Sequence, residues 1–156
     1  CIVDCMKMNE VLATTIDKIE GIFISNGPFD PRDYKVTIDW LRMIMKLRPN
    51  LPIFGICMGH QLMALSSDLE VCKMKYGNRG HNIPTKLVGT SRTFMTSQNH
   101  GYAVIVPKDS AAIATIHELF MNLNDGSNEW LWWSDRPYFS VQFHPEACSG
   151  PRDTMK

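Results

Sequence analysis

The 156 residues carry equal numbers of acidic and basic side chains, so the formal net charge is zero. This balance gives no indication of binding to nucleic acid or to an anionic membrane surface, and the length suits one domain with a hydrophobic core. No apolar run is long enough to span a bilayer, and no signal peptide is visible at the start.

The predicted elements of the first half alternate between strands and helices. They are a strand at residues 1–3, a mixed helical pattern at 10–19, a strand at 21–25, a loop at 26–31, a helix at 33–47, a strand at 51–56 and a helix that follows Cys57. This alternation predicts parallel strands in an α/β sheet. Ligands bind at the carboxyl ends of such strands, where both the 26–31 loop and Cys57 fall.

The second half has a different pattern. Residues 76–84 are polar and rich in glycine and asparagine, which predicts a loop. Short strands are predicted at 93–97, 102–106, 119–122, 131–134 and 138–143, separated by turns such as 124–127. There is no repeat and no low-complexity linker, so residues 1–156 are interpreted as a single domain.

The cysteines do not form a disulfide or metal pattern. Their number is five, which is odd, and no spacing repeats, so we expect a reducing compartment. Cys57 and His60 alone are too few for a zinc site, the five histidines lack ligand spacing, and we expect no metal. The chain begins at Cys1 without a methionine, and we expect it to be a piece of a longer polypeptide.

Cys57 lies in a Gly-x-Cys-x-Gly turn between an apolar run and a helical pattern. Strand, tight turn and helix in this order form a nucleophile elbow, and Gly55 and Gly59 suit the close approach of the two backbones. The helix N-terminus would favour a thiolate. A buried structural cysteine is the alternative interpretation.

His144 ends a strand in which apolar and polar residues alternate, and Pro145 stops that strand. Histidine is the usual base for a cysteine nucleophile, and a carboxylate orients its ring. Glu146 can take this role if the chain bends at Pro145. A capping histidine and a solvated carboxylate are the alternatives, because spacing alone does not bring Cys57 and His144 together.

At this point the elbow and the His144-Pro145-Glu146 motif resemble the class I (triad) glutamine amidotransferases. The resemblance extends through residues 25–31, 73–82, 96–104 and 124–129 in the order of the family. The 76–82 and 97–102 stretches resemble the glutaminase part of eukaryotic carbamoyl-phosphate synthetases, of the pyrimidine or the arginine pathway. The resemblance implies an α/β, flavodoxin-like open sheet that is mostly parallel, with extra antiparallel strands and without its first strand–helix unit.

The family's chemistry then implies that Cys57 attacks the side-chain amide of glutamine, His144 moves the proton, and Glu146 holds His144. The oxyanion is expected to rest on backbone N–H groups of Met58 and Phe29. The substrate contacts that the resemblance implies are Gly27, Met58, Gln61, Gln98, Asn99, Gly101 and Tyr102.

The resemblance also implies the partners. Ammonia would pass to a separate or fused carbamoyl-phosphate synthetase. No cofactor is expected in this domain, because ATP and magnesium would be used only by the synthetase partner. The pyrimidine interpretation favours a cytoplasmic location, with the mitochondrion as the alternative.

The sequence departs from the family pattern at Phe29, Asp68 and Trp130, where the family usually has glycine. If Phe29 needs a positive φ, the oxyanion loop is strained. A second hypothesis is therefore a catalytically impaired domain kept for binding or regulation. A third is another user of the triad, such as an anthranilate synthase glutaminase, which the 78–82 stretch disfavours. A strand and helix before Cys1 and a closing helix after Thr154 are missing relative to the family, so we expect that these residues alone fold poorly or expose apolar surface.

Overall fold

The computed structural model describes residues 16–107, 114–147 and 153–154, which form one seven-stranded sheet with two α-helices. The strands are β1 (Ile22–Ile24), β2 (Ile53–Ile56), β3 (Glu70–Leu87), β4 (Thr93–Ile105), β5 (Ile116–Asn122), β6 (Asn128–Trp133) and β7 (Tyr138–Val141). The helices are α2 (Lys35–Leu47) and α3 (Met58–Ser66), with short 3₁₀ turns η2 (Ile16–Lys18) and η3 (Pro31–Asp33). No helix among these described residues is long and apolar enough to cross a membrane.

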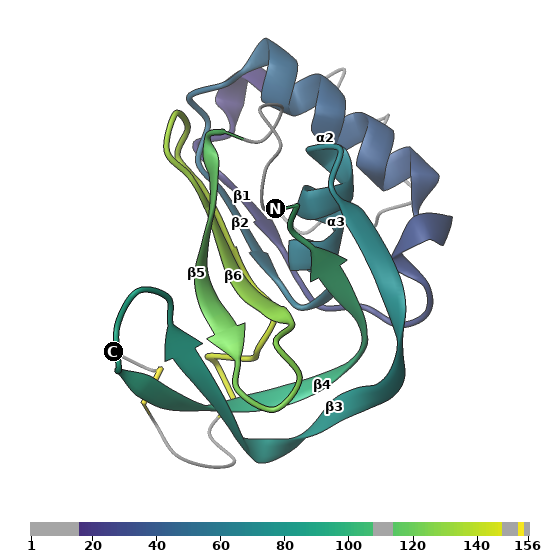
Figure 1. Ribbon diagram of the computed structural model, residues 1–156. Helices are drawn as coiled ribbons and strands as arrows, with labels where there is room; N and C mark the ends of the chain where they lie inside the picture. Colours follow the sequence, from purple (N-terminus) through teal and green to yellow (C-terminus); the bar gives the residue numbers. More distant parts are fainter. Residues whose placement is uncertain (1–15, 108–113, 148–152, 155–156) are drawn as a thin grey trace.

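The sheet order is β1-β2-β7-β6-β5-β3-β4. Only β1, β2 and β7 pair in parallel, whereas the other four pairings are antiparallel. The expected α/β class is confirmed, but the expectation of a mostly parallel sheet is wrong. All four antiparallel pairings involve strands from β3 onward, where the long β3–β4 ribbon curls away from the helices in Figure 1.

The stretch 76–84, predicted as a loop, lies inside β3, and the two strands predicted at 93–97 and 102–106 are one strand, β4. Cross-strand pairing explains both differences, because Asn78 pairs with His100 and Gly80 with Gln98. Register shifts interrupt the ribbon on both sides of these pairs. The other predicted strands from residue 21 onward and both helices from residue 33 onward are confirmed within a few residues. The strand predicted at 1–3 and most of 10–19 lie outside the described residues.

The main core lies between the sheet and the two helices. α2 buries one face, with Leu41 and Ile44 fully buried, as its apolar spacing predicts. Alternating residues of the parallel strands divide between the two faces of the sheet. Ile53 packs into the core beneath the helices, and Phe54 joins a second, smaller cluster with Ile56, Val141 and Phe143.

Candidate active site

Cys57 lies at the tight turn between β2 and α3, with φ 54° and ψ −102°. A positive φ is rare for a residue with a side chain, and such strain is typical of a nucleophile elbow. The two glycines are required by the close approach of the backbones. A Cβ on Gly55 would lie 2.6 Å from the carbonyl carbon of Gly59, and one on Gly59 would overlap the carbonyl oxygen of Ile24. The predicted strand–turn–helix is therefore confirmed.

The thiol of Cys57 is buried, and its Sγ lies 3.8 Å from the carbonyl oxygen of Asn99, which it can reach as a weak donor. Burial raises the pKa of the thiol to about 11, and the negative charges of Glu146 and Glu129 add to this rise. The N–H of Met58 at the start of α3 opposes it. The expected preference for a thiolate is thus outweighed in the unliganded protein, so a base must remove the proton.

His144 follows β7, and its Nδ1 lies 2.8 Å from Oε1 of Glu146. This hydrogen bond assigns the proton of the neutral ring to Nδ1 and leaves Nε2 as an acceptor. The backbone N–H of His144 donates to the carbonyl of Ser97 at 2.8 Å. Because the thiol of Cys57 contacts Asn99, that thiol and the backbone of His144 meet β4 only two residues apart, or about 7 Å of strand.

A pocket with a volume of about 730 Å³ lies beside Cys57. Its lining includes most of the predicted contacts: Gly27, Phe29, Cys57, Met58, Gln61, Asn99, Gly101 and Tyr102. His144 and Glu146 lie outside this lining. A larger cavity of about 900 Å³, between the β3–β4 ribbon and β5, contains none of the predicted residues.

Gln98 differs from its prediction because it does not line the pocket. Its side chain is buried and bonds with Thr96, His100 and Asn122 inside the molecule. Gln61 does line the pocket, but its Nε2 donates to Gln142 at 2.9 Å and to the carbonyl of Tyr102 at 3.1 Å. Its amide is therefore held in place by the protein.

Sequence reasoning missed the positive charge of the pocket. Lys73, Lys75 and Arg79 from β3 all line it, and no acidic side chain of the described residues does. The spacing of Lys73 and Lys75 could have indicated this charge, because alternate residues of a strand lie on the same face. The interpretation of the following residues as a loop hid this signal. Such a lining suits a ligand that carries a carboxylate.

Two of the departures from the family pattern have clear structural positions. Phe29 has φ 72° and is 81% exposed at the pocket, so the chain keeps a backbone typical of glycine there. Trp130 stacks on Phe120 with a centroid separation of 5.1 Å and meets Phe143 edge to face. It therefore packs against the smaller core cluster and contacts Phe143, the residue before His144.

Comparison with known proteins gives a consistent result. A model of the family described as glutamine amidotransferase class-I matches residues 1–156. The "Multifunctional protein pyrABCN" of Emericella nidulans is 53% identical over 136 residues, which are 86% of this chain and 6% of that protein. The "Carbamoyl phosphate synthase arginine-specific small chain" of Yarrowia lipolytica is 52% identical over 138 residues, which are 86% of this chain and 30% of that protein. The chain thus spans less than a third of these relatives.

Solved structures share the fold. A putative GMP synthase protein of Thermoplasma acidophilum superposes with a TM-score of 0.75 at 21% identity, covering 99% of this chain and 76% of that one. A glutamine amidotransferase of Methylobacillus flagellatus gives a TM-score of 0.68 at 18% identity, covering 86% of this chain and 55% of that one. At such identities the likeness concerns the fold alone.

Proposed function

Because the chain belongs to the class I glutamine amidotransferase family, we propose that it hydrolyses glutamine through Cys57, His144 and Glu146 and supplies ammonia for carbamoyl phosphate synthesis. The observation that carries this proposal is the elbow. A cysteine with positive φ and a histidine paired with a carboxylate adjoin the same stretch of β4. The similarity to carbamoyl phosphate synthase small chains supports carbamoyl phosphate synthesis as the use of the ammonia.

In the proposed reaction, His144 accepts the thiol proton of Cys57 through Nε2 while the sulfur attacks the side-chain amide carbon of glutamine. A C–S bond forms, and the C–N bond breaks as His144 returns the proton to the departing ammonia. Water then cleaves the glutamyl thioester and yields glutamate and the free thiol. Glu146 accepts a hydrogen bond from Nδ1 of His144 and stabilises the imidazolium.

The N–H groups of Met58 and Phe29 are proposed to hold the oxyanion, since both residues line the pocket next to Cys57. The positive φ of Phe29 supports this role because it retains the backbone that a glycine would adopt. The cations Lys73, Lys75 and Arg79 suit the α-carboxylate of an amino acid. The predicted contacts Gly27, Gln61, Asn99, Gly101 and Tyr102 complete the proposed glutamine site, with Gln98 behind them.

The ammonia acceptor is proposed to be a carbamoyl-phosphate synthetase, fused or separate. Relatives of both kinds match this chain, namely multifunctional proteins and small chains. ATP and magnesium would act only in that partner. A cytoplasmic location, with the mitochondrion as the alternative, is part of this proposal.

Glutamate release by the intact protein, with and without its synthetase, tests the function. We expect Cys57→Ser and His144→Asn to lose at least about a thousandfold in turnover. Cys72→Ser is the matched control, since Cys72 is a free but exposed cysteine away from the pocket. If Cys57→Ser keeps normal release, the proposal fails. If glutamate release appears only after Phe29→Gly, the result favours the second hypothesis, a catalytically impaired domain kept for binding or regulation.

A further inference from the structure

A buried row of polar side chains runs from β6 to the pocket. Oε1 of Glu129 accepts from Nδ2 of Asn122 at 2.9 Å, and the same nitrogen lies 3.3 Å from Oε1 of Gln98. Gln98 Oε1 in turn lies 3.0 Å from Nε2 of His100, which lines the pocket beside Cys57. All four side chains are almost completely buried, with Glu129 at 0% exposure.

The orientation of the Gln98 amide follows from its neighbours. The hydroxyl of Thr96 donates to the carbonyl of Ile83 at 2.8 Å, so its oxygen can only accept from Gln98, 2.9 Å away. The NH₂ group of Gln98 therefore faces Thr96, and Oε1 faces His100. An amide flip would also set two NH₂ groups, those of Gln98 and Asn122, against each other.

Both ring nitrogens of His100 consequently meet acceptors. Nδ1 lies 2.8 Å from the carbonyl oxygen of Tyr102, which cannot donate, and Nε2 meets Gln98 Oε1. A neutral imidazole has only one N–H and would leave two lone pairs facing each other at one of these contacts. An imidazolium, which has two N–H groups, would satisfy both contacts.

We propose that Glu129 is a positioning residue that, through Asn122 and Gln98, holds His100 as an imidazolium, so that a buried positive charge lines the pocket beside Cys57. The two buried groups compensate each other, since the hydrogen bonds transmit the preference of one charge for the other. Burial alone acts against both charges. It lowers the pKa of His100 and raises that of Glu129 to about 8. In the proposal, each of the two charges therefore persists only while the other is present.

The other charged or titratable groups that face His100 are His60 on α3, Arg79 on β3, Asp125 in the turn before β6 and His144 after β7. Asp125 favours the imidazolium, whereas Arg79 and a protonated His144 oppose it. Burial lowers the pKa of His60 to about 3, so His60 stays neutral. The proposed role of Glu129 is to add its negative charge to that of Asp125 and so offset these opposing cations.

Glu129 affects the pKa of the Cys57 thiol in two ways that have opposite directions. Acting directly, the negative charge of Glu129 raises the pKa of the thiol. Acting through His100, Glu129 keeps a positive charge near the sulfur and favours the thiolate. The catalytic benefit rests on the proposed glutaminase function, but the thiol's reactivity does not.

The test is the rate at which iodoacetamide alkylates Cys57 in the intact protein at pH 7, followed on the Cys57 peptide. We expect Glu129→Gln to slow alkylation on the order of fivefold, and its log rate–pH profile to lose an inflection from His100 or move it about one pH unit lower. In a His100→Gln background, Glu129→Gln is expected to leave the rate unchanged or raise it.

Glu118→Gln is the matched control. Glu118 also accepts from an asparagine amide, that of Asn128 at 2.8 Å, but is not part of the row that leads to His100. An unchanged or faster alkylation rate in Glu129→Gln overturns the inference, as does an equal slowing in Glu118→Gln. If Glu129→Gln does not fold, Gln98→Met breaks the same row and must give the same slowing. Absent glutamate release with this alkylation pattern intact would overturn the proposed function alone.

Discussion

At the scale of single residues, Phe29 has a strained backbone. A positive φ costs a residue with a side chain about 1–2 kcal/mol relative to glycine, and the ring of Phe29 is 81% exposed, so it regains little by packing. We predict that Phe29→Gly raises the melting temperature of the intact protein by a few degrees, while glutamate release changes less than about tenfold because the loop already has its backbone conformation.

Phe29→Ala is the control for this prediction, because it removes the ring and keeps the strain. Its melting temperature should stay at or below that of the parent protein. An equal gain in both variants would assign the cost to the exposed ring and not to the backbone.

The buried thiol of Cys57 makes stability depend on alkaline pH. Burial raises its pKa from 9.0 to about 11, so the folded protein holds the proton more tightly than the unfolded chain. This contribution is complete below pH 9 and is lost as the pH rises toward 11. Between about pH 8 and about pH 10.5 it should fall by about 2 kcal/mol.

Thermal melts of the parent protein and of Cys57→Ser at the two pH values isolate this effect, since all other groups titrate in both. The parent should lose more stability than the variant. Parallel losses would mean that the thiol is not perturbed by burial.

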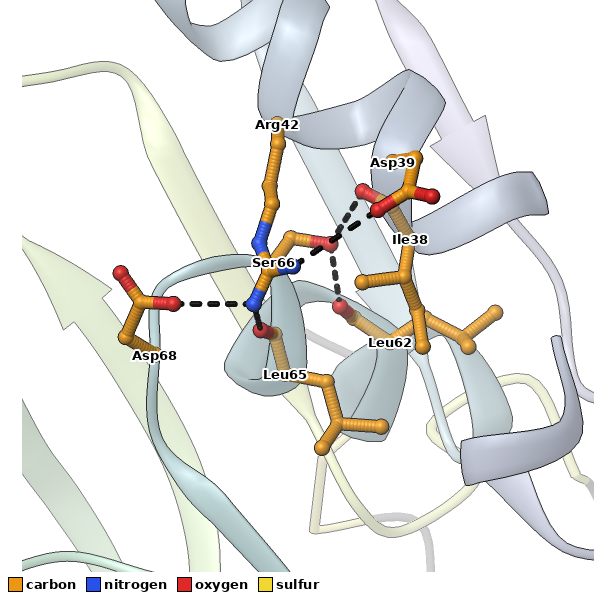
Figure 2. Close-up of polar contacts among 7 residues, drawn as sticks. All are labelled: Ile38, Asp39, Arg42, Leu62, Leu65, Ser66 and Asp68. Atoms are coloured by element: carbon orange, nitrogen blue, oxygen red, sulfur yellow. Dashed lines mark hydrogen bonds and ion pairs between the residues drawn. The ribbon is translucent and has the colours of Figure 1, made fainter. Parts of the chain in front are cut away.

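At the scale of elements, α3 ends in a left-handed residue that α2 supports. Asp68 has φ 60°, and the N–H of Leu69 donates to the carbonyl of Ala64, as in a Schellman end. Figure 2 shows Arg42 reaching from α2 to the carboxylate of Asp68 at 2.9 Å and to the carbonyl of Leu65 at 3.0 Å. Asp68 occupies a position suited to glycine, and Arg42 offsets part of that cost.

This arrangement predicts a ranking of variants. Asp68→Gly relieves the left-handed strain but loses an exposed ion pair worth about 0–1 kcal/mol, so its stability should equal or exceed that of the parent. Asp68→Ala loses the pair and keeps the strain, so it should melt lowest, about 1 kcal/mol below Asp68→Gly. Equal melting of the two variants would contradict the proposed strain.

At the scale of the whole molecule, an aromatic row crosses the sheet face opposite to the helices. Strand register aligns Phe23, Phe54, Phe139 and Trp132 on neighbouring strands. The ring of Phe54 contacts the rings of Phe23 and Phe139. Phe23, Phe139 and Trp132 are 61%, 41% and 42% exposed. The expected exposure of apolar surface is therefore found on this face.

We predict that the isolated 156-residue chain self-associates through this row. Combined Phe23→Lys and Phe139→Lys should shift its sedimentation toward the monomer. Tyr76→Lys is the control, because Tyr76 is 77% exposed but lies on β3, outside the row. The control should keep the self-association of the parent chain. Self-association that persists in the double variant would place the contact elsewhere.

The sequence predicted the elements that follow from local patterns. Local patterns predicted α2 from its apolar period, the tight turn at Cys57 from its glycines, and the strand before His144 from its alternation. The His144-Pro145-Glu146 motif predicted the contact between His144 and Glu146, which are 2.8 Å apart. The β3–β4 ribbon was missed because its polar stretch is a strand only through pairing with distant residues. The burial of Gln98 and its link to Glu129 depend on the same pairing, which no local pattern encodes.

The central claim is that Cys57 forms a covalent intermediate with glutamine, and acid quenching tests it directly. Incubating the intact protein with labelled glutamine, stopping the reaction in acid and analysing the Cys57 peptide by mass spectrometry should reveal a glutamyl thioester. The adduct should be absent from Cys57→Ser and present in Cys72→Ser. Steady glutamate release without any adduct on Cys57, or with the adduct on another residue, would contradict this account.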